Sequence, residues 1–223
     1  MNNSADGFNY PGLYLLTHDG RRILLTQEKI DSFAKNFEAN LHRFPIEVRC
    51  AVNFKPCAVC PEKDAAVFCH ALPAALTFFE ELKDFKSDDR ADAFYSDSPR
   101  SHICVRNITM QEALQFVVLM SLLKGCEVGR KYARYFTGIH PLMETSELLA
   151  RLDLNIYWDC KGNRGKIEKE RREFASEISC VSECQVKRLR LVCENDALVN
   201  AFARTQEQIE RLVSSSGSEW AKS

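Results

Sequence analysis

The first part of the chain has an apolar and polar pattern that predicts a β-hairpin followed by a helix. Residues 12–26 contain two runs rich in leucine and isoleucine on either side of Asp19-Gly20, and glycine accepts the positive φ of a tight turn. Thr26 is placed to cap the helix that follows. The apolar residues of this helix recur at helical spacing and form one stripe: Ile30, Phe33, Phe37 and Leu41.

The middle of the chain predicts short strands and a long buried helix. Residues 46–54 alternate and predict a strand, residues 72–85 a helix, and residues 89–96 a short strand. Thr109 and Glu112 fit a capping box at the start of the buried helix, because each side chain can satisfy a backbone N–H of the other residue. Gly125 is placed to end this helix in a left-handed conformation.

The composition changes at residues 160–173, where glycine, asparagine and then charged residues dominate. Residues 166–213 predict helix with a break near Asn195-Asp196. Polar residues interrupt the apolar stripe of this region: Gln185, Arg188, Asn195 and Gln206. These interruptions favour a helix or helical pair packed on the rest of the chain over a helix that forms a homodimer or binds a partner protein.

These patterns together predict an α+β fold with a small antiparallel sheet, packed helices and a helical C-terminal extension. We expect an α+β domain over residues 1–158, the helical extension over 159–213 and a disordered tail over 214–223.

Charge and hydropathy exclude some functions and locations. The net charge of −1 provides no field that attracts nucleic acid or an anionic membrane, so we expect neither as a partner. The longest apolar run, residues 113–123, is too short to cross a bilayer. The first residues resemble no signal peptide, which predicts a cytoplasmic protein.

Ten cysteines in a reducing compartment are expected to be free thiols or metal ligands. Five of them lie scattered in apolar patterns and are expected to be small buried side chains: Cys50, Cys104, Cys180, Cys184 and Cys193.

Cys57 and Cys60 form a CxxC pair between Pro56 and Pro61, followed by Cys69. A tight turn aims both thiols of such a pair at one point, and the prolines favour a turn over a helix there. Cys69 can loop back to supply a third ligand.

The fourth ligand has three candidates. His70 adjoins Cys69, and neighbouring residues seldom both face one ion. Cys126 directly follows Gly125, where another backbone segment can approach closely, and is the preferred choice. His140 is the third candidate, with a role beside a bound thiolate as its alternative.

The same residues resemble an uncharacterised family of bacterial cytosolic proteins, a domain of unknown function, over roughly residues 12–158. The resemblance consists of an F-x-x-C-x-x-C-P segment, a further cysteine, a tyrosine after a strand, a T-x-x-Q-x-x-L type helix, a Gly-Cys pair and a late histidine. These are residues 54–61, Cys69, Tyr95, residues 109–115, Gly125-Cys126 and His140. The family more often has proline where this chain has His70. The resemblance therefore implies Cys57, Cys60, Cys69 and Cys126 as the ligand set, and it implies no activity.

A set of four cysteines suits zinc and also an iron–sulfur cluster. We therefore expect a zinc-binding scaffold or regulatory protein and not an enzyme, with an iron–sulfur or CxxC dithiol redox protein as the alternative. A dithiol centre would need the CxxC pair at a helix N-terminus, and Pro61 permits one. No nucleophile elbow, HExxH motif or P-loop is present to indicate a hydrolase or nucleotide site.

Overall fold

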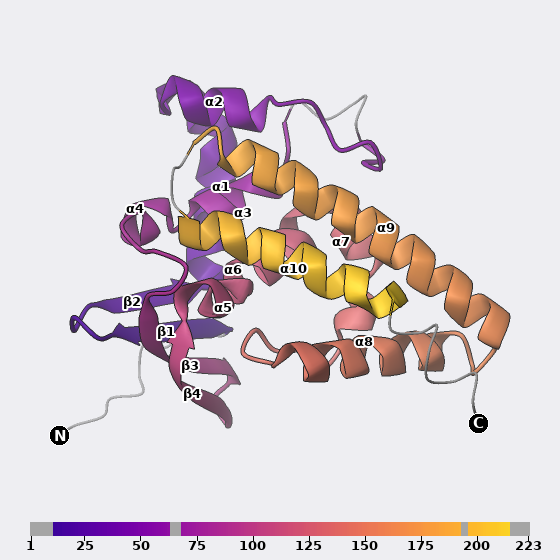
Figure 1. The fold of residues 1–223 in the computed structure, drawn as a ribbon. Coiled ribbons are helices and arrows are strands. Elements are labelled where there is room, and N and C mark those ends of the chain that lie inside the picture. The colour runs from indigo at the N-terminus through magenta and orange to yellow at the C-terminus, as the bar shows by residue number, and fades with distance from the viewer. Residues whose placement is uncertain (1–10, 63–67, 193–195, 215–223) are drawn as a thin grey trace.

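The computed structural model describes residues 11–62, 68–192 and 196–214, and it confirms the α+β class with helices packed on one face of an antiparallel sheet (Figure 1). The four strands are β1 (Gly12–Thr17), β2 (Arg22–Thr26), β3 (Arg90–Ser98) and β4 (Ser101–Thr109), in the order β2-β1-β3-β4. The predicted hairpin is β1 and β2, with Gly20 at a φ of +83° in its turn. Leu13 and Leu15 point into the core, whereas Phe94 lies on the exposed face.

The helices between β2 and β3 differ in part from the prediction. They are α1 (Gln27–Asn40), a 3₁₀ turn (Leu41–Arg43), α2 (Ile46–Val52), α3 (Leu72–Leu76) and α4 (Phe79–Leu82). The strand predicted over 46–54 is wrong, because α2 occupies most of it. Val48, Ala51 and Val52 are its buried residues, and they recur at helical spacing. The helix predicted over 72–85 is broken into α3 and α4.

The edge strand β4 lies where no strand was predicted. Its exposed and partly buried residues alternate, so it presents little apolar signal, as expected of an edge. The short strand predicted over 89–96 is β3, which pairs with β1 and β4.

The predicted capping box is confirmed at Thr109 and Glu112. The helix that it starts is interrupted, as α5 (Met110–Ala113), α6 (Gln115–Met120) and a π-helical turn (Ser121–Gly125). Phe116, Val117 and Val118 are fully buried in α6. The left-handed end predicted at Gly125 is wrong, since the positive φ values among the described glycines are at other positions.

The rest of the described chain is helical. It comprises α7 (Glu127–Lys131), a 3₁₀ turn (Ala133–Phe136), α8 (Thr145–Asp159), α9 (Arg164–Leu189) and α10 (Asp196–Ser214). α9 and α10 pack side by side and run across α7, α8 and the α5–α6 region (Figure 1). Phe174, Ile178 and Phe202 are buried within the chain, as a packed helical pair requires.

The predicted division of the chain, between residues 158 and 159, falls in the last turn of α8, just before its connection to α9. The predicted tail lies outside the described residues except for Ser214, which ends α10. None of the described helices combines the length and the apolar character that crossing a bilayer requires.

Candidate cysteine site

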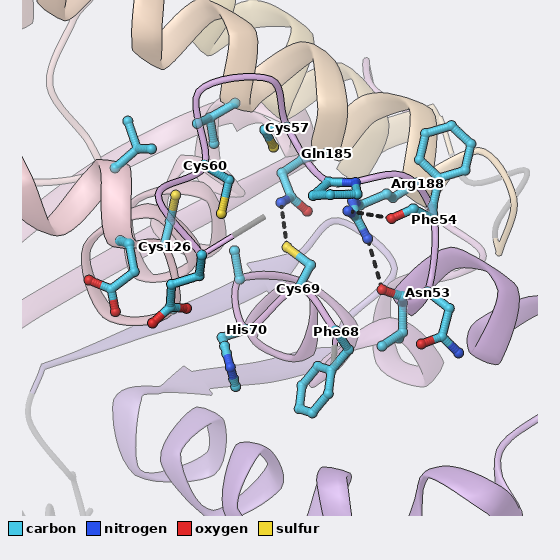
Figure 2. Close-up of a pocket in the computed structure, with 18 residues that line it drawn as sticks. Asn53, Phe54, Cys57, Cys60, Phe68, Cys69, His70, Cys126, Gln185 and Arg188 are labelled. Carbon is cyan, nitrogen blue, oxygen red and sulfur yellow. Dashed lines mark hydrogen bonds between the residues drawn. The ribbon is translucent and has the colours of Figure 1, made fainter. Parts of the chain in front are cut away.

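Three segments that are far apart in the sequence meet at a pocket of about 110 Å³, and all four predicted cysteine ligands line it (Figure 2). Cys57 and Cys60 come from the turns after α2, Cys69 from the segment before α3, and Cys126 from the residue between the π-helical turn and α7. All four predicted residues therefore lie around the same pocket.

The CxxC pair lies in a turn and not on a helix. The backbone N–H of Cys60 donates to the carbonyl oxygen of Cys57 at 3.0 Å, and residues 57–62 form successive turns. Among the described residues no helix begins at this pair, so none places its N-terminal dipole at the Cys57 thiol. The physical reason for reading Cys57 and Cys60 as a catalytic dithiol is thus missing from the described residues.

Gly125 lets the segment that carries Cys69 approach the segment that carries Cys126. A Cβ at position 125 would lie 2.7 Å from the Cα of Ala71 and nearer still to the carbonyl oxygen of His70. The hydroxyl of Ser121 donates to the carbonyl oxygen of Ala71 at 2.7 Å and fastens the same contact. The close approach expected at Gly125 is therefore present, although its predicted backbone conformation is not.

The pKa of the Cys126 thiol depends on its burial and on the two cysteines nearby. Burial raises the pKa of the Cys126 thiol to about 11, hydrogen bonds from the backbone of Gly129 and Val128 oppose the rise, and the Cys69 and Cys60 sulfur atoms add to it. The neighbouring sulfur atoms disfavour the thiolate form of Cys126, whereas a bound cation would favour it.

The four thiols do not converge fully. Figure 2 shows Cys60, Cys69 and Cys126 around the interior of the pocket, whereas Cys57 lies against α9 beside Gln185. In residues 11–62, 68–192 and 196–214, no group of three or more His, Cys, Asp or Glu side chains is arranged to hold a metal ion.

Cysteine is a ligand type that thiophilic metals prefer, and a polar residue of α9 lies beside these thiols in the pocket wall. Gln185 is 1% exposed, and its Nε2 donates to the Cys69 sulfur at 3.2 Å. Its Oε1 is buried and has no hydrogen-bond partner in the structure. A buried polar atom of this kind in a pocket wall is typical of a place that receives a further group or water.

Helix α9 supplies residues that the sequence pattern does not assign to the site. In the sequence, Gln185 and Arg188 interrupt an apolar stripe, and Cys184 is one of the scattered cysteines expected to be buried. Cys184, Gln185 and Arg188 stand at positions i, i+1 and i+4 of the helix. Side chains at these positions lie on the same side of a helix. The signal in the sequence that could have indicated these residues is that polar side chains cluster at positions of the apolar stripe, where a buried residue is expected.

Arg188 is 1% exposed and holds the segment before the CxxC pair. Its guanidinium donates to the carbonyl oxygens of Ala51, Val52, Phe54 and Lys55 at 2.8, 2.9, 2.8 and 3.1 Å. Its Nε also donates to the Cys184 sulfur at 3.4 Å. This one side chain therefore fixes the approach to Cys57 and touches a second thiol.

The Cys57 and Cys184 thiols are hydrogen-bonded to each other. Cys57 donates to the Cys184 sulfur, which lowers the pKa of Cys184 to about 6; burial opposes this change and Arg188 supports it. The same hydrogen bond and burial raise the pKa of Cys57. Of the two thiols, Cys184 is therefore the one that loses its proton more readily.

Neither candidate histidine joins the cysteines. The His70 ring packs against Phe68 with ring centres 4.6 Å apart and points away from the sulfur atoms (Figure 2). The His140 ring stacks on Tyr95 at 6.2 Å, and His140 does not line the pocket. Burial lowers the pKa of His140.

The remaining cysteines vary in exposure. Cys50 and Cys104 are exposed, so the expectation of buried thiols is wrong for both. Cys180 is partly buried, and Cys193 lies outside the described residues.

Comparison of the chain with protein-family models, with curated proteins and with solved structures finds no match. The resemblance to a bacterial family with this cysteine pattern stays a prediction.

Proposed function

We propose that the protein binds one zinc ion through Cys57, Cys60, Cys69 and Cys126 and acts as a metal-binding scaffold or regulatory protein. The observation that supports this proposal is that four thiols from three distant segments line one pocket. Thiolates select zinc and iron–sulfur clusters among the common biological metals. A bound ion would link the turn after α2, the start of α3 and the start of α7, and its binding energy would stabilise irregular segments that bury little apolar surface.

The residues of the chain have distinct parts in this proposal. Cys60, Cys69 and Cys126 already surround the pocket, while Cys57 must exchange its hydrogen bond to Cys184 for the ion. Gln185 donates to Cys69 and would stabilise that sulfur as a thiolate beside the metal. Four thiolates fill a tetrahedral zinc ion, which leaves no open position for catalysis.

An iron–sulfur cluster is the alternative occupant of the same site, since it takes the same four ligands. To distinguish the two, the full chain is expressed with zinc and iron in the medium and purified without oxygen. Its visible spectrum, metal content and acid-labile sulfide are then measured. A colourless protein with about one zinc per chain supports the proposal, and a brown protein with iron and sulfide supports the alternative.

Matched serine variants test which thiols bind. We expect Cys60→Ser and Cys126→Ser to lose most of the metal, while Cys50→Ser and Cys104→Ser, which replace exposed thiols, keep the wild-type content. A wild-type protein that takes up neither metal, or a Cys126→Ser variant with full metal content, would contradict the proposed site.

A further inference from the structure

Helix α8 leaves three apolar side chains uncovered on its outer face. The helix lies at the edge of the molecule, with α9 and α10 packed on one side of it (Figure 1). Leu154, Tyr157 and Trp158 are 43%, 47% and 68% exposed, and Trp158 is the most exposed large apolar side chain in the described parts of the chain. Their spacing of i, i+3 and i+4 puts them on one face, apart from the buried stripe of the same helix: Leu148, Leu152 and Ile156.

The two aromatic residues lie at the turn that ends α8. Their ring centres are 5.8 Å apart, with the ring planes at 82°. The N–H of Lys161 donates to the carbonyl oxygen of Trp158 and that of Gly162 to the carbonyl oxygen of Tyr157, both at 3.1 Å. The Tyr157 hydroxyl lies 3.1 Å from where a Cβ of Gly162 would be, so its ring reaches the turn that leads into α9.

Lys161 stands at a position of this turn where glycine is most common. Its φ is +52°, the left-handed conformation in which helices often end. The backbone of the turn thus holds a lysine directly after the aromatic pair.

The charges left without a partner at this turn are positive. Lys161, Arg164 and Lys166 are exposed, and no carboxylate in the described ranges forms an ion pair with any of them. The two aspartates of α8 are each paired with an arginine from another part of the fold: Asp153 with Arg171, and Asp159 with Arg134. An exposed apolar patch with free cations beside it is complementary to an acidic partner.

The same charges make other partners less suitable. Two copies joined through this surface would be related by a two-fold axis, which brings the cations of one copy near those of the other. A nucleic acid requires a continuous row of cations, and Glu168 and Glu173 interrupt the row at the start of α9. A short acidic segment with an apolar side chain matches both the aromatic pair and the cations.

We propose that the end of α8 is a docking surface for an acidic segment of another protein. An apolar side chain of the partner packs against Trp158, and its carboxylates lie beside Lys161 and Arg164. Tryptophan, tyrosine and arginine are the residues that contribute most to binding at protein interfaces. None of these residues lines the cysteine pocket, so the docking surface does not depend on the proposed metal site.

The test screens the immobilised full chain against a phage-displayed library of short random peptides. We expect the enriched peptides to combine aspartate or glutamate with leucine, phenylalanine or tryptophan. The most enriched peptide is synthesised with a fluorescent label, and its affinity is measured by fluorescence anisotropy. Vesicles that contain phosphatidylserine and a single-stranded oligothymidine are tested in parallel.

Two variants locate the binding surface. We expect Trp158→Ala to weaken peptide binding about tenfold, as at other interface anchors, and Lys161→Gly about threefold. Lys161→Gly should not lower the melting temperature, because glycine accepts the positive φ at this position. The matched controls are Phe94→Ala, an exposed apolar residue of the sheet, and Lys35→Ala, an exposed lysine of α1; both should bind the peptide like wild type.

The proposal is overturned if no peptide is enriched, if the enriched peptides lack acidic residues, or if Trp158→Ala binds them as tightly as wild type. Binding of the vesicles or of the oligothymidine that Trp158→Ala abolishes would also overturn it, in favour of a membrane or a nucleic acid. The metal content of Trp158→Ala should equal that of wild type, which keeps this result separate from the test of the cysteine site.

Discussion

Gly125 has no side chain, and the segment of His70 and Ala71 lies where a side chain would be. This contact brings the segment of Cys69 close to the segment of Cys126. A side chain at position 125 would keep the two segments apart. The sequence pattern indicated a special glycine at the end of the helix. It could not indicate which backbone would approach, because that backbone belongs to a segment far away in the chain.

Gly125→Ala should therefore damage both stability and metal binding. The added methyl group forces the 69–71 segment away, and we expect a loss of about 2 kcal/mol in the free energy of unfolding, as for other overpacked sites. Urea denaturation and metal analysis check this. Gly165→Ala is the matched control, because a Cβ there meets nothing nearer than the Asn163 side chain at 3.7 Å and helix propensity improves. Equal stability of the two variants would show that the close approach does not matter.

At the scale of elements, the sequence pattern predicted a structure correctly where the residues that form it are close together in the chain. The capping box was visible in the sequence because both of its members lie in one helical turn: the Thr109 N–H and hydroxyl donate to Glu112 at 3.1 and 2.6 Å. The signals failed at α2 and β4. Alternating residues in 46–54 resembled a strand, and the polar edge strand β4 gave no strand signal.

Glu112→Gln should reduce stability in a pH-dependent way. Burial raises the pKa of Glu112, but hydrogen bonds from Thr109 and the charges of Arg204 and Arg90 outweigh this effect, and the pKa is lowered overall. Its carboxylate therefore stabilises the fold above the unfolded-state pKa of about 4.3, and this contribution is lost as the pH falls through the lower folded-state value.

Denaturation at neutral and acidic pH measures the effect. The glutamine side chain would still accept from Thr109 but would lose the charge beside Arg204, so we expect Glu112→Gln to cost about 0.5 kcal/mol at neutral pH and the difference from wild type to shrink in acid. Glu207→Gln, at an exposed position on α10, should have little effect at either pH. A cost that does not change between the two conditions would rule out the carboxylate as its cause.

At the scale of the whole molecule, the C-terminal helices complete the pocket. The apolar stripe proposed for a homodimer or a partner protein includes Phe174, Ile178 and Phe202, and these are buried inside the chain. An association through α9 or α10 stays a prediction and would need other residues of these helices. Arg188 connects α9 to the segment that follows α2, across the division predicted between the domain and its helical extension.

Arg188→Met should weaken this connection. Four carbonyl oxygens lose a buried donor, and we expect a loss of about 3 kcal/mol in the free energy of unfolding. Arg190→Met is the control, because Arg190 caps the C-terminus of the same helix and is exposed, and its effect should stay within about 0.5 kcal/mol. Urea denaturation compares the two variants. If Arg188→Met unfolds like wild type, the arginine does not hold the two parts of the molecule together.

The sequence by itself determined the fold class, the hairpin, the helix cap and the four cysteines that line the pocket, because each depends on spacing within a short segment or on a residue type with narrow chemistry. Only the tertiary structure revealed that Cys184, Gln185 and Arg188 belong beside them. In the sequence these side chains are polar interruptions of a helix. Their partners are backbone atoms and thiols from the other end of the chain, and the packing of α9 against the segment after α2 is what brings them together.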